Sequence, residues 1–499
     1  MRHIEHFIDG RIVPGISGRH GDVFDPNSGH VQAKVSLASV AELDAAVASA
    51  VAAQAGWAKV NPQRRARVMF EFKRLLEANM DELAALLSSE HGKVLSDARG
   101  DLQRGLEVIE FACGIPHLLK GEYTQGAGPG IDVYSMRQPL GVVAGITPFN
   151  FPAMIPMWMF GPAIASGNAF ILKPSERDPS VPIRLAELMI EAGLPEGVLN
   201  VVQGDKEIVD AILRHPAINA VSFVGSSDIA QYVYGQGAAH GKRVQCMGGA
   251  KNHGIVLPDA DLDQAVADIV GAAYGSAGER CMALPVVVAV GEATANALRD
   301  KLVAAIAGLR IGVSTDPDAH YGPVVTPTHK AKIEQYIQIG VDEGAELVVD
   351  GRGFSLPGHE SGFFLGPTLF DRVTPQMQTW REEIFGPVLQ LMRADTFEDA
   401  IALPTIHQYG NGVAIFTRNG DAAREFADRV EVGMVGINVP IPVPVAYHTF
   451  GGWKRSGFAD LNQYGMDGVR FYTRTKVVTQ RWPRGGAEVE QSFVIPTMR

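Results

Sequence analysis

The stretch from Gln138 to Leu172 constrains the fold more than any other part of the sequence, because it contains no Asp, Glu, Lys or Arg. An apolar run of this length is either a membrane-spanning helix or a buried part of a core. Five prolines interrupt it, at positions 139, 148, 152, 156 and 162, and proline inside a helix breaks the backbone hydrogen-bond ladder. We therefore predict a buried strand over 142–146, a turn rich in Pro and Asn, then a buried helix, and no membrane partner.

The composition indicates a globular chain of several domains. Its 499 residues exceed the ~100–200 of one domain. The net charge of −11 carries no long basic run, which argues against a nucleic-acid partner. Three cysteines cannot build a disulfide framework, and this favours a reducing, cytoplasmic setting. The first residues, Met1-Arg2-His3-Ile4-Glu5, are charged where a secretory signal would need an apolar core.

Predicted strands alternate with predicted helices along most of the chain, which is typical of βαβ units and an α/β fold with a parallel sheet. The Asp-Gly pair within residues 7–12 predicts a hairpin, and Ser39 with Glu42 predicts a capping box that starts a helix. Further strands are expected at 199–202, 220–224, 286–290 and 412–416, and helices at 62–119, 182–192 and 207–214.

Two segments alternate apolar and polar residues with a period of two, at 131–136 and 469–478. This pattern predicts strands that expose one face, such as edge strands or an arm used in oligomerisation. Residues 484–499 show no periodicity and are predicted to be a tail. The sequence has no Gly-x-Gly-x-x-Gly after a strand, no Walker motif, no His-Glu-x-x-His and no paired Cys-x-x-Cys, so we predict no metal site.

Cys281 is the informative cysteine. It follows the small residues Gly275-Ser276-Ala277-Gly278, which permit close approach of a ligand. The neighbouring Arg280 would favour the thiolate form. A free cysteine is nevertheless most often an inert buried residue, so Cys281 alone leaves a nucleophile and a structural residue both open.

Five further segments, taken together with Cys281, favour a nucleophile over a structural cysteine. In this order and at these separations they resemble the aldehyde dehydrogenase superfamily, over about residues 5–482. They are Thr147-Pro148-Phe149-Asn150-Phe151-Pro152, Lys173-Pro174-Ser175-Glu176, Phe223-Val224-Gly225-Ser226, Glu383-Ile384-Phe385-Gly386-Pro387-Val388 and Phe450-Gly451-Gly452.

The resemblance implies an α/β fold with three parts and a tail. A Rossmann-type NAD-binding domain would comprise 1–118 and 140–247, and an α/β catalytic domain 248–448. A β oligomerisation arm would comprise 119–139 and 463–482, followed by a tail at 483–499. The resemblance also implies a homotetramer built as a dimer of dimers.

The resemblance assigns roles to residues of the matched motifs. Cys281 would attack the aldehyde, and the Asn150 amide with the Cys281 backbone N–H would form the oxyanion hole. The implied NAD contacts are Phe149, Lys173 and Glu176 with Arg177 beside them, Gly225 and Ser226 at the pyrophosphate, and Glu383 and Phe385 at the nicotinamide ribose and ring. Glu176 would repel a 2′-phosphate and favour NAD over NADP, although the neighbouring Arg177 weakens that inference.

Each of these assignments has a structural alternative. The Asn150 side chain could bond its own loop, Lys173 and Glu176 could be a solvated pair at a helix start, and Glu383 could be an ordinary surface charge. Cys113 and Cys246 are interpreted as structural.

One departure from the family pattern predicts the acyl acceptor. Hydrolytic members carry a glutamate in Glu-Leu-Gly-Gly-Lys that activates the deacylating water. Here Met247 or Cys246 takes its place, depending on the alignment. Neither side chain is a useful base at neutral pH. A thiol acceptor removes the need for one, which favours coenzyme A as co-substrate.

Two arginines predict the substrate. Arg280 precedes the nucleophile and Arg104 lies on a helix that looks core-packed; a guanidinium matches a carboxylate in two hydrogen bonds. With Ala250-Lys251-Asn252-His253 and Phe471-Tyr472-Thr473, they resemble the CoA-acylating methylmalonate-semialdehyde dehydrogenase group. That group oxidises and decarboxylates methylmalonate or malonate semialdehyde with NAD, giving propionyl-CoA or acetyl-CoA.

Three alternatives stay open. Arg104 could simply pair with Glu107 one turn further along its helix. The protein could be a hydrolytic aldehyde dehydrogenase that activates water elsewhere. It could also be a non-catalytic protein on this fold.

Overall fold

The computed structural model describes residues 1–483, and the predicted tail from 484 lies outside them. The uncharged stretch folds as predicted, into a strand, β8 (Val142–Ile146), a turn, and a helix, α6 (Met154–Ala165), in which every residue of both elements is buried. Within residues 1–483, no helix is both long and apolar enough to cross a membrane.

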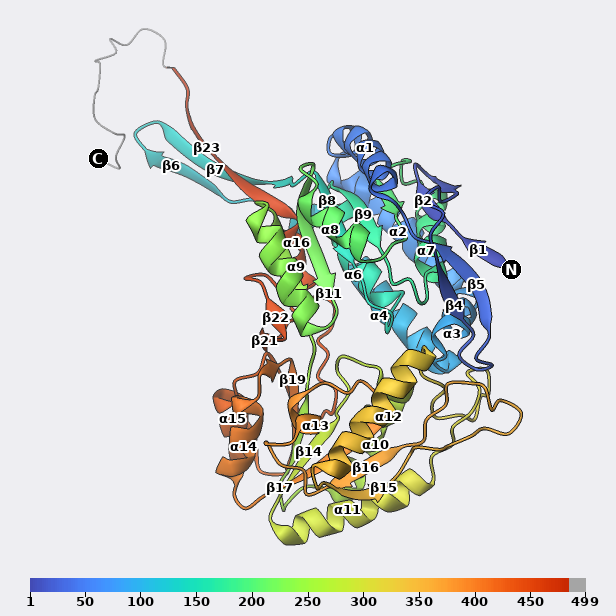
Figure 1. The fold of residues 1–499 in the computed structure, drawn as a ribbon. Coiled ribbons are helices and arrows are strands. Elements are labelled where there is room, and N and C mark those ends of the chain that lie inside the picture. Colours follow the sequence, from blue (N-terminus) through green and yellow to red (C-terminus); the bar gives the residue numbers. More distant parts are fainter. Residues whose placement is uncertain (484–499) are drawn as a thin grey trace.

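An eight-stranded sheet forms the upper body of Figure 1. Its five central strands are parallel, and antiparallel strands close both edges. In spatial order the strands are β22 (Gly457–Phe458), β12 (Arg243–Met247), β11 (Ile218–Val224), β8, β9 (Ala169–Lys173), β10 (Leu199–Val201), β2 (His6–Ile8) and β3 (Arg11–Val13).

Helices cover both faces of this sheet, because successive residues of its strands are apolar and point to opposite sides. Val142, Ala144 and Ile146 of β8 pack in one cluster, and Val143 packs in another. One face carries α1 (Val40–Trp57), α8 (Lys206–Arg214) and α9 (Ser227–Ala239). The other carries α2 (Pro62–Ala78), α3 (Met80–His91), α4 (Leu95–Cys113), α5 (Ile115–Leu118), α6 and α7 (Ser180–Glu191).

A seven-stranded sheet forms the second body. Its order is β15 (Glu346–Val349), β16 (Thr368–Asp371), β17 (Val388–Ala394), β14 (Val286–Val290), β13 (His253–Val256), β19 (Gly412–Phe416) and β20 (Met434–Ile437). Around it lie α10 (Leu262–Tyr274), α11 (Glu292–Ala307), α12 (Pro327–Asp342), α13 (Gln378–Arg381), α14 (Phe397–Ile406) and α15 (Gly420–Arg429).

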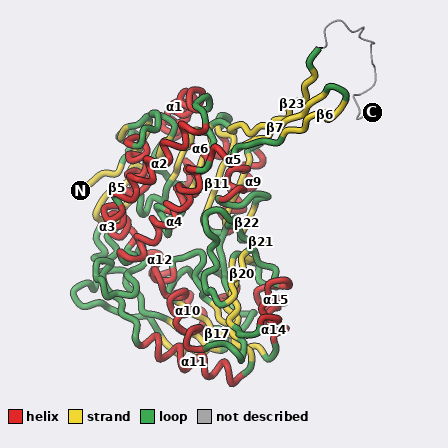
Figure 2. Tube along the Cα trace, turned by 180° about the vertical axis from the view of Figure 1, so that it is seen from behind, coloured by secondary structure: helices red, strands yellow, loops and turns green. Residues whose placement is uncertain are grey.

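A three-stranded arm projects from the first body, as both views show (Figures 1 and 2). Its central strand β7 (Ile131–Pro139) pairs with β6 (Tyr123–Gly128) and with β23 (Thr473–Arg481). Two smaller sheets complete the fold: β1 (Arg2–Ile4), β5 (Val31–Ser36) and β4 (His20–Phe24), and β18 (Tyr409–Gly410) with β21 (Trp453–Lys454).

The prediction of a strand over 469–478 is wrong in its first part. Residues 469–471 belong to a helix, α16 (Gly465–Phe471), and the strand begins at Thr473. Val469 and Phe471 are both buried against the first body. The apolar residues at 469 and 471 therefore belong to a helix that packs on the core, and they do not form one face of a strand.

Most local predictions are confirmed. The hairpin β2–β3 turns at Asp9 and Gly10, both with positive φ (55° and 74°), which is what a two-residue hairpin turn requires. The backbone N–H of Ser39 donates to the Glu42 carboxylate (2.7 Å) at the start of α1. The proposed domain boundaries stay a prediction. Residues 449–462 lie between the predicted catalytic domain and the predicted arm, and they include β22, which pairs with β12 at the edge of the first sheet.

Candidate active site

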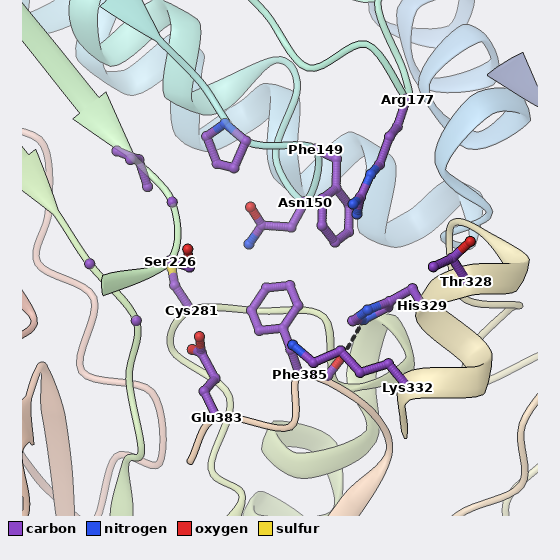
Figure 3. Close-up of a pocket in the computed structure, with 15 residues that line it drawn as sticks. Phe149, Asn150, Arg177, Ser226, Cys281, Thr328, His329, Lys332, Glu383 and Phe385 are labelled. Atoms are coloured by element: carbon purple, nitrogen blue, oxygen red, sulfur yellow. Dashed lines mark hydrogen bonds between the residues drawn. The ribbon is translucent and has the colours of Figure 1, made fainter. Parts of the chain in front are cut away.

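A cavity of about 300 Å³ opens between the two bodies. We call it the catalytic cavity (Figure 3). Asn150, Cys281, Glu383 and Phe385, which the sequence placed in one site, all contribute to its wall. The full lining comprises Pro148, Phe149, Asn150, Arg177, Val224, Gly225, Ser226, Gly248, Gly249, Cys281, Thr328, His329, Lys332, Glu383 and Phe385.

A second hollow, of about 440 Å³, continues the catalytic cavity over the first sheet. We call it the cofactor groove. Lys173 and Glu176 line it, with the Lys173 Nζ 3.0 Å from the Glu176 carboxylate. The Lys173 side chain is buried, whereas the Glu176 side chain is 42% exposed, so the pair is solvated on one side only. The two hollows share the residues Pro148, Phe149, Arg177, Val224, Gly225 and Ser226.

Strand order explains why this groove forms here. From β8, the chain adds β9 and β10 on one side and then β11 and β12 on the other, so the order reverses between β8 and β11. Ligands of doubly wound sheets bind at the carboxyl ends of strands at such a switch point. The amino end of α9 follows Ser226 there, and free N–H groups at a helix start attract phosphate. The groove therefore has the position in the fold and the helix start that suit a dinucleotide.

The Asn150 side chain points into the catalytic cavity towards Cys281 in Figure 3. Among residues 1–483, no hydrogen bond joins its amide to its own turn. The loop of Cys281 is held by two amides, since Asn252 Nδ2 and Asn411 Nδ2 donate to the Cys281 carbonyl at 3.0 and 3.1 Å. The thiol and the amide are therefore presented to one space by two separately anchored loops.

Burial and the nearby Glu383 carboxylate raise the pKa of the Cys281 thiol to about 12. The prediction that Arg280 favours the thiolate is wrong for this structure, because the Arg280 guanidinium turns to Asp97 (2.7 Å). The surroundings of Cys281 in this structure therefore disfavour ionisation of its thiol.

The turn before Cys281 is strained. Ser276, Ala277 and Gly278 all have positive φ, of 54°, 52° and 74°. A Cβ on Gly278 would lie 2.1 Å from the Gly386 carbonyl oxygen, so only glycine fits there. Small residues thus bring this turn against the loop that carries Phe385, whose own φ is 62°. Strain of this kind concentrates where a site needs fixed backbone geometry.

Glu383 is the one carboxylate in the described lining of the catalytic cavity. It accepts a hydrogen bond from the Ala250 N–H (2.9 Å), and burial raises its pKa to about 7. Cys246 and Met247 are buried and do not contribute to that lining, which includes only the glycines after them. The cavity therefore has no acidic side chain from this segment, as the sequence predicted.

Three lining residues were not predicted from the sequence: Thr328, His329 and Lys332, all from the first turns of α12. His329 Nε2 donates to the Phe385 carbonyl at 2.8 Å, and burial lowers its pKa to about 4. Thr326 and Pro327 are a recognisable helix start, but nothing in the sequence places that start opposite Phe149.

The two predicted substrate arginines lie outside the catalytic cavity, and each already has an acidic partner. Arg104 donates to Glu107 (2.8 Å) and to the Pro444 carbonyl (2.7 Å), and its side chain is 30% exposed. The alternative ion pair is thus present. The buried Tyr464 lies within electrostatic reach of both Arg104 and Cys281. The substrate role of Arg104 and Arg280 stays a prediction.

Comparisons with known proteins agree with this geometry. The aldehyde dehydrogenase family profile matches residues 12–478. Malonate-semialdehyde dehydrogenase from Pseudomonas aeruginosa is 56% identical and covers 100% of both chains. The acylating, mitochondrial methylmalonate-semialdehyde dehydrogenase of Arabidopsis thaliana is 49% identical over 96% of this chain and 79% of that one.

Two solved structures that resemble this chain are also semialdehyde dehydrogenases by name. A structure from Sinorhizobium meliloti, complexed with NAD, is 65% identical with a TM-score of 0.97, over 97% of this chain and 99% of that one. Methylmalonate-semialdehyde dehydrogenase from Oceanimonas doudoroffii is 56% identical with a TM-score of 0.96, over the same shares. The resemblance and the α/β fold predicted from sequence motifs are confirmed. The chain belongs to the aldehyde dehydrogenase family.

Proposed function

We propose that the protein oxidises methylmalonate semialdehyde or malonate semialdehyde with NAD and transfers the acyl group to coenzyme A. One observation carries the proposal: Cys281 and Asn150 line one cavity in which no carboxylate comes from residues 246–249. The names of relatives from Pseudomonas aeruginosa and Arabidopsis thaliana support the substrate class.

In this proposal the Cys281 thiol first gives its proton to water. Its sulfur then bonds to the aldehyde carbon, and the electrons of the carbonyl double bond move to the oxygen, which becomes an oxyanion. The Asn150 amide and the Cys281 backbone N–H stabilise that charge. Lys173, Glu176, Gly225 and Ser226 hold NAD along the cofactor groove, with Phe149 and Arg177 beside it. NAD, when bound, accepts the hydride that leaves the carbon. The acyl group then remains on Cys281 as a thioester.

The thioester carbonyl lies β to the substrate carboxylate. When carbon dioxide leaves, the electrons of the broken carbon–carbon bond pass into that carbonyl, and a proton then adds to the carbon. The thiol of coenzyme A attacks the remaining thioester and releases Cys281. No residue of the segment 244–253 has to activate water in this sequence of steps.

Omitting coenzyme A tests the acyl acceptor. With malonate semialdehyde and NAD alone, we expect a burst of about one NADH per active site and then a slow rate, because acyl-enzyme accumulates. Adding coenzyme A should restore steady turnover, measured by NADH absorbance. Rapid linear turnover without it would favour the hydrolytic alternative. The variant Glu383→Gln would then show whether the cavity's one described carboxylate activates the water.

The substrate carboxylate is proposed to bind Arg104 and Arg280. This requires the carboxylate to displace or share the acidic partners of these arginines, which are Glu107 for Arg104 and Asp97 for Arg280. Arg104 is the cleaner of the two to test, because Arg280 adjoins the nucleophile.

Changing Arg104→Leu should lower catalytic efficiency with malonate semialdehyde roughly ten- to a hundredfold, and much less with propanal, because one charged hydrogen bond is lost. The matched control is Glu107→Gln, which breaks the ion pair but keeps the guanidinium; because it removes the acid that competes for Arg104, it should keep or raise the ratio of the two efficiencies. An unchanged ratio in Arg104→Leu would make Arg104 a structural residue that holds the 443–444 backbone.

The arm and the cysteine content support two further parts of the proposal. We propose a homotetramer, a dimer of dimers, in which the arm β6–β7–β23 joins subunits, and a cytoplasmic location. Light scattering of the purified protein, compared with a variant lacking the arm strand after Tyr472, would test the assembly.

A further inference from the structure

Lys93 is a buried cation that the proposed chemistry does not use. Its ammonium donates to the backbone carbonyl of Asn150 at 2.7 Å and lies 3.5 Å from the Asp101 carboxylate. It also lies 4.3 Å from the centre of the Phe151 ring. Both members of the Lys93–Asp101 pair are fully buried. One side chain therefore contacts both Asn150, whose amide is the proposed oxyanion donor, and the residue after it, Phe151.

Asp101 holds the other end of the same turn. Its second carboxylate oxygen accepts the N–H of Met154, the first residue of α6, at 2.7 Å. Lys93 and Asp101 thus hold the segment from Asn150 to Met154 by hydrogen bonds at its two ends. Neither residue belongs to that segment, since Asp101 lies in α4 and Lys93 in the loop before α4.

Stability is a poor reason for burying these charges. Burying two ions is less favourable in free energy than burying an apolar pair of similar size, unless good geometry and further hydrogen bonds compensate for the lost hydration. Burial raises the pKa of Asp101 to about 6, although the neighbouring Lys93 opposes that shift. A methionine and a leucine could fill the same space, but neither could hold a backbone carbonyl.

We propose that Lys93 and Asp101 are positioning residues for the reaction, which fix the turn so that the Asn150 amide meets the developing oxyanion. The inference rests on the proposed role of Asn150. Lys93 touches neither substrate nor cofactor in this proposal and acts through the Asn150 backbone. Displacing a catalytic group by about 1 Å can cost roughly a hundredfold in rate.

The test is a double-mutant cycle on the full-length protein, read from the single-turnover burst of NADH with propanal. We expect Lys93→Met to lower the burst rate roughly ten- to a hundredfold, with little change in NAD affinity. In the Asn150→Ala background, the same change should cost less than about threefold, because the amide it positions is already gone. Equal losses in both backgrounds would overturn the proposal.

Two more variants separate positioning from folding. Lys93→Met with Asp101→Asn leaves no uncompensated buried charge, so it should fold and still show the burst loss. The control is Asp371→Asn, which breaks another largely buried pair, Arg393 with Asp371 (2.6 Å), on the second sheet. It should lower the melting temperature and leave the burst rate unchanged. A normal rate for Asn150→Ala alone would instead refute the proposed oxyanion hole.

Discussion

Changing Cys281→Ala is expected to abolish aldehyde-dependent NADH formation and to leave NAD binding nearly intact. The thiol would make the covalent bond to the substrate, whereas the cofactor groove is built from the ends of β8, β9 and β11 and the start of α9. Removing one sulfur atom at the cavity wall therefore removes the reaction without removing the groove. Steady-state NADH absorbance measures the first quantity, and calorimetric titration with NAD measures the second.

Cys113→Ala is the control for this variant. Cys113 is a buried cysteine at the end of α4, and burial raises its pKa to about 11. Its loss should change stability without removing turnover. Near-normal turnover by Cys281→Ala would refute covalent catalysis at this residue.

Changing Asn150→Ala is expected to lower the rate of acylation roughly 10²- to 10³-fold, the usual effect of removing one oxyanion donor. We expect the rate constant to fall and the Michaelis constant to change little, because the charge develops only as the thiol adds to the aldehyde. The burst rate of NADH formation measures it directly.

Asn219→Ala provides a matched amide elsewhere in the fold. The Asn219 amide donates to the Leu140 carbonyl at 2.9 Å, beside the opposite end of strand β8. This variant should keep the acylation rate, which would show that losing an asparagine near β8 is not by itself harmful. A comparable loss in both variants would assign the effect to the strand and not to an oxyanion hole.

Local patterns predicted much of the fold. The strand over 142–146, the strand over 286–290 and the Asp9–Gly10 turn were read from apolar runs and turn residues, and the structure has them at those positions. Such features depend on neighbours in sequence, since a strand with both faces buried must be apolar throughout. The helix over 465–471 was misread because its period-two spacing was as compatible with a strand.

The sequence by itself determined the family, the candidate nucleophile Cys281 and the absence of an acidic residue near position 247. Each of these depends only on which amino acid occupies a position of a known motif. Only the tertiary structure decided which groups surround them. It brought α12 with His329 against Phe385, turned Arg280 towards Asp97, and placed Lys93 under the Asn150 carbonyl. These contacts join residues far apart in the chain. They depend on how two sheets and their loops pack, and that arrangement leaves no local pattern to read.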